Sequence, residues 1–358
     1  MWQESVWKLV YILVFLGSLC LSLMFVPLVK RFAYVFNVLD HPSPRKVHTF
    51  PTPLTGGIAV YLSIVGTIII GLSGKNLLPY FSAYSASISS VMPKLAGFLI
   101  TSAVVVIVGF LDDIYHINPL TKILFQIICG LITFFAGIKI SFFSSNLYVH
   151  IILTVLWIVV CMNSFNLLDH MNGLAAGVAF IAGSIFFFFS SGNGQLFIST
   201  LLACFLGSIL GFLRYNFPCA EIFLGECGSS FIGYFLGCLA IMGTYYQYKP
   251  DQNFLPVLSP LLIFALPFFD TISVVYIRIK NKKPVFMADT NHLSHRLVRL
   301  GMSPMQAVIF CYLLTLACGI GALLLRNLTT SGGIIVFCQT LLILVCVALL
   351  ESTGRKHA

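Results

Sequence analysis

Long apolar segments alternate with short polar connections along almost the whole chain. A helix needs about 20 apolar residues to cross a bilayer core, and hydrocarbon offers the backbone no partner outside its own helix. No alternation of period 2, typical of a membrane barrel, is visible. The pattern predicts an all-α polytopic membrane protein, with one domain over residues 1–358 and about 11 (10–11) transmembrane helices. The apolar runs are 6–28, 56–73, 92–111, 120–137, 148–165, 173–191, 195–213, 228–244, 257–279, 304–325 and 332–350.

The composition agrees with this architecture. Of the 358 residues, 59% are hydrophobic and 9% are charged, and the mean hydropathy is +0.99. These values exclude collagenous, disordered, secreted disulfide-framework and DNA-binding proteins, and they leave no room for a soluble catalytic domain. The 11 cysteines form no C-x-x-C pair, which is typical of packing thiols. The first run is longer than a signal-peptide core, so we expect it to remain as the first span.

Basic residues are distributed unequally between the two sets of loops that eleven spans define. The set that includes the C-terminal tail holds 14 of the 20 Lys and Arg residues. By the positive-inside rule this side is cytoplasmic and the N-terminus is outside. The net charge of +9 is therefore a topology signal, with anionic membrane lipids as partners and no nucleic acid. The 14 residues are Lys30, Arg31, Arg45, Lys46, Lys122, Arg214, Arg278, Lys280, Lys282, Lys283, Arg296, Arg299, Arg355 and Lys356.

Most acidic residues fall on the same side. A carboxylate within a membrane segment costs about 2.5–3.5 kcal/mol on insertion scales, so such residues indicate function. Separated loops could converge there, which predicts an active site at the cytoplasmic face. Asp270, inside the ninth run, must be paired within the protein, and a structural or cleft-lining role is favoured over catalysis. The acidic residues on this side are Asp40, Asp112, Asp113, Asp169, Glu221, Glu226 and Asp289.

The segment G-F-L-D-D at 109–113 ends an apolar run and precedes Lys122 on the next one. Adjacent carboxylates such as Asp112 and Asp113 disfavour joint ionisation unless a cation neutralises them. A hard, oxygen-ligated ion such as Mg²⁺ fits this role. The alternative is a solvated pair of loop acids.

The segment N-S-F-N-L-L-D-H-M-N-G at 163–173 repeats a polar residue at every third position, namely Asn163, Asn166, Asp169 and Asn172. On a helix or 3₁₀ end, these side chains would line one face. Amides and a carboxylate so placed could contact a nucleobase or sugar and support a metal. A polar lining for a water-filled vestibule is the alternative.

The segment F-L-G-E-C-G-S-S at 223–230 places Glu226 between glycines, just before an apolar run. The N-terminus of the following helix would favour phosphate groups, and Glu226 is a candidate metal ligand. A simple connector is the alternative.

Two further cytoplasmic loops carry basic side chains. Residues 288–297 space Asp289, His292, Arg296 and Arg299 so that they would share one face of a short helix, which suits a phosphate clamp better than a zinc site. Anchoring to lipid head groups is the alternative there. Residues 40–57 form a Pro-rich, extended stretch before Gly-Gly, and a positive-inside loop is the alternative for it. That stretch contains Arg45, Lys46 and His48.

Taken together and in this order, the five segments resemble the polyprenyl-phosphate N-acetylhexosamine-1-phosphate transferase superfamily over about residues 37–305. The R-K-x-H loop before P-x-P-x-x-G-G and the separated histidines look like its WecA and TagO branch. The resemblance implies transfer of a sugar phosphate, with N-acetylglucosamine as the default sugar, from a UDP-sugar to undecaprenyl or another polyprenyl phosphate. UMP is released, Mg²⁺ is required, and Mn²⁺ is a possible substitute. It also implies a bacterial cytoplasmic membrane enzyme that starts a cell-envelope polysaccharide, and a possible homodimer.

The resemblance also implies roles for individual residues. Asp112 and Asp113 are the candidate catalytic residues, and Glu226, Asn166 and Asp112 are the candidate metal ligands. Asp112 would act as a base or phosphate-positioning carboxylate in a single displacement, and an aspartate nucleophile forming a phospho-enzyme is the competing route. The candidate substrate-binding residues are Arg45, Lys46, His48, Lys122, Asn163, Asp169, Asn172, Asp289, His292, His295 and Arg296.

Three departures from the family pattern stand out. Glu226 replaces the usual Asp; His170 and Asn172 replace the Gly and Asp of D-G-x-D-G; and Ser294 replaces the first histidine of the H-H pair. The remaining alternatives are a phospho-N-acetylmuramoyl-pentapeptide translocase, a secondary transporter or lipid carrier, and a catalytically dead homologue.

Overall fold

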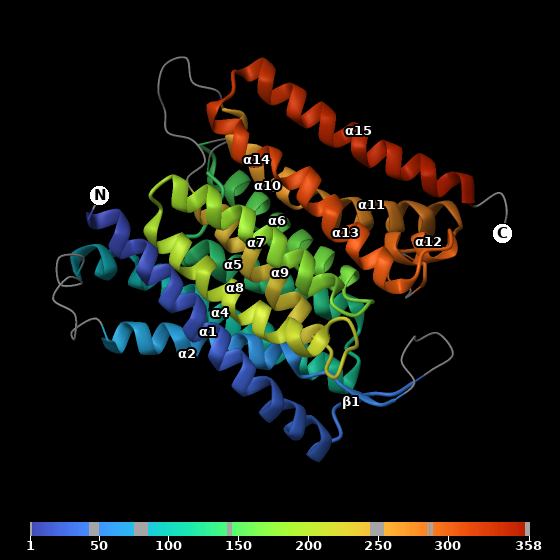
Figure 1. Ribbon diagram of the computed structural model, residues 1–358, viewed down its shortest axis with the longest axis horizontal. Helices are drawn as coiled ribbons and strands as arrows, with labels where there is room; N and C mark the ends of the chain where they lie inside the picture. The colour runs from blue at the N-terminus through green and yellow to red at the C-terminus, as the bar shows by residue number, and fades with distance from the viewer. Residues whose placement is uncertain are drawn as a thin grey trace.

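The computed structural model describes residues 2–42, 50–74, 85–141, 145–243, 254–284, 286 and 289–354. In this part of the chain the helices run side by side as one bundle (Figure 1). Strands β1 (Leu39–Asp40) and β2 (Thr52–Pro53) pair antiparallel, and 3₁₀ turns cover Leu255–Leu258 and Leu325–Asn327. The helices are α1 (Trp2–Val35), α2 (Gly56–Gly74), α4 (Ser85–Tyr115), α5 (Pro119–Phe135), α6 (Leu147–Leu168), α7 (Leu174–Gly192), α8 (Leu196–Asn216), α9 (Gly225–Met242), α10 (Ser259–Ile263), α11 (Ala265–Lys280), α12 (Leu293–Arg299), α13 (Pro304–Gly319), α14 (Gly321–Leu324) and α15 (Thr330–Gly354).

Every predicted apolar run coincides with helical structure, which confirms the all-α multi-pass architecture. Within the described residues nine helices are long and apolar enough to cross a membrane, and the bent pair Leu255–Ile263 and Ala265–Lys280 makes up to ten. The run predicted at 120–137 forms α5, which has 17 residues and lies at the lower limit for crossing. The eleventh span of the prediction therefore corresponds to this short helix.

The ninth predicted span is broken rather than continuous. Its two halves, α10 and α11, are bent by 65° at Phe264. Pro267 has no N–H to donate to the carbonyl four residues earlier, at Ile263, so the helical hydrogen-bond ladder is interrupted there. The bend turns α11 and its Asp270 toward the end of the bundle that carries α12.

Polar caps fix where two helices begin near the site. The Asn118 side chain accepts the N–H of Leu120 at 2.9 Å, and Pro119 opens α5. Ser303 and Gln306 form a capping box at the start of α13. These side chains satisfy first-turn N–H groups that have no partner in the helix. The cap on α5 thereby fixes the position of Lys122, which lies in the first turn of that helix.

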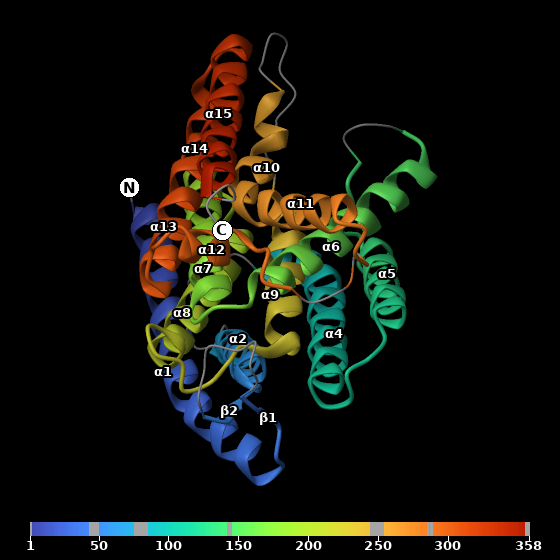
Figure 2. The same cartoon turned by 90° about the vertical axis from the view of Figure 1, so that its right-hand side faces the viewer.

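The central helix of the bundle is α9. Of its most apolar window 83% is buried, against 17% for α1 and for α15 at the periphery. Figure 2 looks at the end of the bundle that carries α12 and the hairpin, and shows α9 in the middle. It contacts α2, α4, α6 and α7, so its first turn is surrounded by other helix ends.

Glycines allow α2 and α4 to approach α9 backbone to backbone. A Cβ on Gly57 would lie 2.2 Å from the Cα of Gly228, and a Cβ on Gly109 would lie 2.4 Å from the Cα of Cys227. No side chain fits in either position. The close approach brings the last turn of α4, with its two aspartates, against the first turn of α9.

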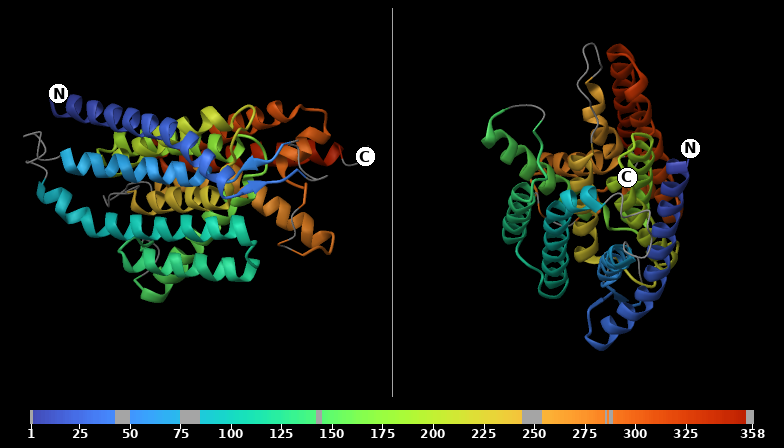
Figure 3. Two further views of the ribbon diagram at one scale, coloured as in Figure 1. Left: turned by 90° about the horizontal axis from the view of Figure 1, so that it is seen from below. Right: turned by 90° about the vertical axis from the view of Figure 1, so that its left-hand side faces the viewer.

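The polar motifs gather at one end of this bundle. Helices α4 and α6 end there and α5 and α9 begin there, because Asp112, Asn166, Lys122 and Glu226 are in mutual contact. The β1–β2 hairpin and α12 lie at the same end, while α1 begins at the opposite end (Figures 1 and 3). The two chain ends lie at opposite ends of the bundle, as an odd number of crossings requires. Which side of the membrane each end faces stays a prediction.

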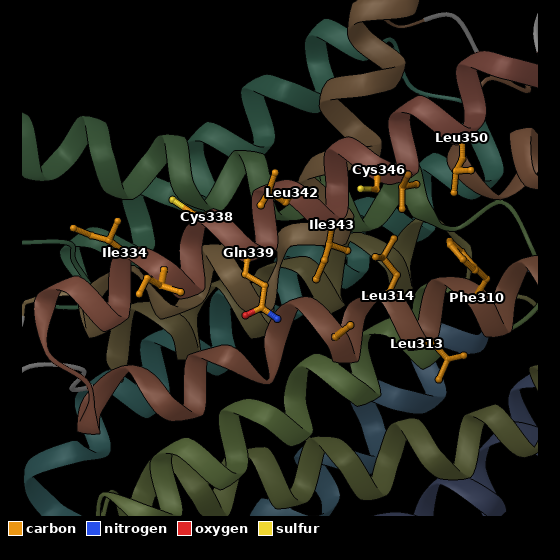
Figure 4. Close-up of a pocket in the computed structure, with 13 residues that line it drawn as sticks. Phe310, Leu313, Leu314, Ile334, Cys338, Gln339, Leu342, Ile343, Cys346 and Leu350 are labelled. Atoms are coloured by element: carbon orange, nitrogen blue, oxygen red, sulfur yellow. The ribbon is translucent and has the colours of Figure 1, made fainter.

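An apolar groove lies between α13 and α15. It has a volume of about 700 Å³ and is lined by residues such as Leu314, Leu342 and Ile343, with Gln339 as a polar member (Figure 4). Phe310 is its one phenylalanine. Other phenylalanines pack in the core instead; Phe205 and Phe235 stack with ring centroids 4.8 Å apart.

Candidate active site

Lys122 joins carboxylates that come from two other helices. Its ammonium lies 2.6 Å from Asp112 Oδ2, in the last turn of α4, and 3.0 Å from Glu226 Oε1, in the first turn of α9. The Asp112 carboxylate also shapes the connection to α5, because its Oδ1 accepts the N–H of Ile117 at 2.7 Å. Asp112 is buried and Glu226 is half-buried. The sequence prediction that these three residues form one site therefore agrees with their positions.

Asn166 completes this group from the last turn of α6. Its amide nitrogen donates to Glu226 Oε2 and, at 3.1 Å, to Ser229 Oγ. Its amide oxygen has no hydrogen-bond partner among the residues that the structure describes. The site therefore combines two carboxylates, one amide oxygen and one ammonium from four helices, which we call the carboxylate site.

The donor atoms of the carboxylate site suit a hard divalent cation. Carboxylate and amide oxygens are the ligands that Mg²⁺ prefers, and the Lys122 ammonium shows that a positive charge is accommodated between Asp112 and Glu226. Among the described residues no three His, Cys, Asp or Glu side chains are grouped to hold a metal. A metal ion here would therefore compete with Lys122 and use Asn166 or substrate oxygens as further ligands.

Asp113 faces a different partner from its neighbour. Its Oδ1 accepts the N–H of Glu226 at 2.8 Å and its Oδ2 accepts the N–H of Cys227 at 3.2 Å. Both carboxylate oxygens therefore cap the start of α9. This geometry favours a positioning role over the predicted catalytic role. It also corrects the expectation that this helix N-terminus is open to phosphate, because Asp113 already takes its N–H groups.

The polar residues at every third position of the second motif do not share one face, because α6 ends at Leu168. The Asn163 amide donates to Gln126 Oε1 at 2.5 Å and to the Val159 carbonyl at 2.8 Å, which ties α6 to α5. Asn166 alone of the four contacts Glu226 by a hydrogen bond.

The other two residues of that motif lie beyond the helix. Asp169 is the C-cap of α6. Burial, and then the charge of Glu226, raise the pKa of the Asp169 carboxyl to about 8. Asn172 follows in the loop, where its amide donates to the Pro218 carbonyl at 3.3 Å. Asp169 is therefore beside the carboxylate site, and Asn172 points to a neighbouring loop.

A second polar group surrounds His292. The Nδ1 of His292 lies 2.8 Å from Asp270 Oδ2, and Asp270 Oδ1 accepts the N–H of Leu293 at 2.6 Å. Because a carboxylate can only accept, Nδ1 of His292 carries the proton. Its Nε2 has no hydrogen-bond partner within the described part of the chain. Asp270 is buried and paired inside the protein, as expected, and it holds the His292 ring in place.

Three imidazoles stack in this group. The His170 ring lies 4.2 Å from that of His292, at an interplanar angle of 28°, and 4.9 Å from that of His295, at 30°. Burial, and then the charge of His292, lower the pKa of His170 to about 3 and also lower the pKa of His295. We call His170, His292 and His295 the imidazole cluster. Because His170 directly follows Asp169, the end of α6 joins this cluster to the carboxylate site.

Arg296 is used inside the protein. It is buried, its Nε lies 2.8 Å from Glu351 Oε2, and its Nη2 donates to Ser273 Oγ at 2.9 Å. Its Nη1 donates to the Asn291 carbonyl. These contacts favour a structural role over the predicted clamping of substrate phosphate.

Asp289 is also engaged internally. Arg278 Nε lies 3.1 Å from its Oδ2, and the N–H of Asn291 donates to its Oδ1 at 3.1 Å. Burial raises the pKa of Asp289, but the hydrogen bonds from Arg278 and Asn291 outweigh it and lower the pKa to about 2. Since α12 begins at Leu293, Asp289 and His292 lie outside it. The predicted single helix face is therefore wrong.

Some predicted residues could not be compared and others were missed. Arg45, Lys46 and His48 lie outside the described residues. Sequence reasoning missed Ser229, although its position three residues after Glu226 on a helix was the available signal. It also missed Glu351, an acidic residue at the end of the last apolar run, whose partner Arg296 is 55 residues away.

Comparison with known proteins agrees with this arrangement. A family model described as glycosyl transferase family 4 matches residues 95–244, which contain the whole carboxylate site. A Bacillus subtilis protein named "probable undecaprenyl-phosphate N-acetylglucosaminyl 1-phosphate transferase" is 31% identical over 89% of this chain and 86% of its own length. The decaprenyl-phosphate N-acetylglucosaminephosphotransferase of Mycobacterium leprae is 30% identical over 80% of this chain and 76% of its own length. The Escherichia coli K12 undecaprenyl-phosphate alpha-N-acetylglucosaminyl 1-phosphate transferase is 25% identical over 82% and 77%.

Proposed function

The chain belongs to glycosyl transferase family 4, and from this premise we propose that it transfers N-acetylglucosamine 1-phosphate from UDP-N-acetylglucosamine to a polyprenyl phosphate, undecaprenyl phosphate in the first instance. The products are a polyprenyl-diphospho-sugar and UMP. The names of the similar proteins support the sugar and the lipid. The proposal includes a location in the bacterial cytoplasmic membrane, with the carboxylate site at the cytoplasmic face, and a role at the start of a cell-envelope polysaccharide.

The observation that carries this proposal is the Lys122 ammonium between the carboxylates of Asp112 and Glu226. The reaction must bring together two anions, a lipid phosphate and a nucleoside diphosphate, and cations at a preorganised site offset their repulsion. Four helix ends supply this site at one end of a membrane bundle. A polyprenyl phosphate embedded in the bilayer can reach such a position with its head group while a soluble UDP-sugar enters from water.

In the proposed reaction a phosphate oxygen of the lipid attacks the β-phosphorus of the UDP-sugar. A new P–O bond forms there, the bond to the bridging oxygen breaks, and that oxygen leaves with UMP. A phosphate monoester has its second pKa near 6, so the attacking oxygen is largely ionised at neutral pH. Asp112 then has to position the lipid phosphate and Lys122 rather than to remove a proton. Direct attack without a phospho-enzyme needs no further group.

Mg²⁺ is part of the proposal as the metal cofactor, with Mn²⁺ as a possible substitute. Glu226, Asp112 and Asn166 would hold it, since their oxygens surround the Lys122 ammonium. When bound, the metal ion neutralises charge on the diphosphate and on the departing UMP. Lys122 would then move from between the carboxylates toward a substrate phosphate, which its flexible four-carbon side chain allows.

The imidazole cluster is proposed as a second phosphate contact. His292 Nδ1 is held by Asp270, so Nε2 is the atom left to meet a substrate oxygen. Arg45, Lys46, His48 and His295 remain proposed substrate contacts, and a homodimer remains a prediction.

The proposal is tested with detergent-purified protein, undecaprenyl phosphate and UDP-N-acetylglucosamine. UMP and lipid-linked sugar are measured with Mg²⁺ and with a chelator in excess. We expect both products to form together and to disappear when the chelator is present. A second reaction with the muramoyl-pentapeptide donor tests the translocase alternative. If neither donor gives UMP in a folded protein with added Mg²⁺, the proposed function is wrong.

A further inference from the structure

The two family departures in different loops are in direct contact. His170, at the end of α6, stands where similar transferases have glycine, and Ser294, in the first turn of α12, stands where they have histidine. The His170 Nε2 lies 2.6 Å from Ser294 Oγ although 124 positions separate them in the chain. An imidazole is therefore missing at one position and present at the position that touches it.

We propose that His170 supplies the imidazole that similar transferases carry at position 294, and that positions 170 and 294 act as one unit that positions His292. This inference rests on the proposed function, because it assigns His292 to a substrate phosphate. His170 is a positioning residue in this reading and does not itself touch the substrate.

The hydrogen bonds of His170 define this role. Its Nδ1 lies 2.9 Å from the Leu167 carbonyl, which can only accept, so Nδ1 carries the proton. Nε2 must then accept the hydroxyl proton of Ser294. Both ring nitrogens are used inside the protein, so neither is free for phosphate or for a metal. What the ring offers is its face, which stacks on His292 at 4.2 Å.

His292 is thereby fixed from two directions. Asp270 binds its Nδ1 at 2.8 Å, and the His170 ring covers its face. The remaining nitrogen, Nε2, is left with a defined direction. Losing the His170 ring would leave Asp270 in place but free the His292 ring to tilt about that hydrogen bond.

The space around Ser294 explains why the two departures belong together. Ser294 is 1% exposed, so a histidine at that position needs room that the His170 ring now fills. The backbone at position 170 does not require glycine, since among the described non-glycine residues only Asn37, His116 and Lys282 have positive φ. Each departure alone would therefore either overfill or empty the cluster, and the two together preserve it.

The test is a reciprocal exchange with four proteins: wild type, His170→Gly, Ser294→His, and the double variant. The kcat and the KM for polyprenyl phosphate and for UDP-N-acetylglucosamine are measured separately, together with the midpoint of thermal unfolding in detergent. Because contacting residues couple, we expect each single change to lower kcat/KM about tenfold or more and the double variant to return to within about threefold of wild type. Ser294→His should lose most, because two imidazoles then compete for one buried space.

The double variant decides between the outcomes. If its loss equals the product of the two single losses, positions 170 and 294 are independent and the inference is wrong. A raised KM for either phosphate substrate in the single variants supports it and identifies which phosphate His292 meets. If wild type makes no UMP, the transfer proposal fails instead. The unfolding midpoints then still show whether the double variant recovers, which supports the paired unit, or is additive, which overturns it.

Two further variants separate positioning from general stability. His170→Asn can still donate to the Leu167 carbonyl but has no ring to stack, so we expect an unfolding midpoint near that of wild type and a reduced kcat/KM. Full activity of this folded variant would overturn the inference. His150→Ala, roughly 30 Å away along α6, is the control, and His170→Ala is its matched partner. Only the change at position 170 should alter the kinetics.

Discussion

At the scale of single residues, the two adjacent aspartates at the end of α4 have different partners. The Asp112 carboxylate lies beside Lys122, whereas the Asp113 carboxylate is bound by the N–H groups of Glu226 and Cys227. One of them can meet a substrate phosphate by exchanging an ammonium, which is a mobile partner. The other holds the backbone of a helix whose first turn carries Glu226. A change at either position should therefore reduce turnover, but through different properties of the protein.

We predict that Asp112→Asn lowers turnover by about 10²-fold or more and leaves the unfolding midpoint nearly unchanged. Asp113→Asn should lower turnover as well and should also destabilise the protein by about 0.5–2 kcal/mol, because one cap of α9 is lost. UMP release and thermal unfolding in detergent measure the two effects. Glu221→Gln is the control, since its exposed ion pair with Lys30 contributes little. Near-normal turnover in a well-folded Asp112→Asn protein would remove Asp112 from the reaction.

The residues of the carboxylate site could be predicted because their chemistry is local in the sequence. Adjacent aspartates, a glutamate between glycines and a lysine at a helix start are visible without a partner. The functions of Arg296 and Asp289 could not be predicted in the same way, because each depends on a distant partner, Glu351 or Arg278. Spacing showed which residues carry charge, and only the fold shows which charges are already paired.

At the scale of helices, the site depends on how closely α4 and α9 approach. Gly109 lies against the backbone of Cys227, one turn before the aspartates. Helix existence followed from the apolar runs, and the start of α5 followed from Asn118 and Pro119. The bend at Phe264 and the seven-residue length of α12 did not, because one depends on how Pro267 packs and the other on side-chain contacts. The glycine approach was equally hidden, since a glycine in an apolar run does not show what it faces.

We predict that Gly109→Ala separates α4 from α9 and reduces both stability and activity. Its Cβ would lie 2.4 Å from the Cα of Cys227 and 2.7 Å from its nitrogen, so backbone must move, at a cost of about 1–3 kcal/mol. The hydrogen bonds of Asp113 to α9 would weaken with that movement. Gly71→Ala is the matched control, because a Cβ there meets nothing within 4 Å. Thermal unfolding should show a lower midpoint for Gly109→Ala and an equal or higher one for Gly71→Ala; equal behaviour of the two would show that the approach is not required.

At the scale of the whole molecule, the site and most basic residues lie at the same end of the bundle. Lys30, Arg214 and Arg278 are at this end, near the last turns of α1, α8 and α11. The all-α multi-pass architecture could be predicted from hydropathy alone, because each span must satisfy its own backbone. The direction in which the bundle crosses depends on a charge rule rather than on packing. It therefore has to be measured on the membrane-embedded protein.

We predict that the end carrying the site faces the cytoplasm, and Cys219 reports on it. This cysteine is exposed in the connection between α8 and α9, at the same end as Glu226, and water there supports thiol labelling. A membrane-impermeant maleimide should label it in inverted vesicles but not in intact spheroplasts, and Cys219→Ser should remove that label. In the Cys219→Ser background, Gly192→Cys at the end of α7, where a Cβ meets nothing within 4 Å, should show the opposite pattern. Labelling of Cys219 from outside would reverse the orientation, and the UDP-sugar would then have to reach the site from the wrong side of the membrane.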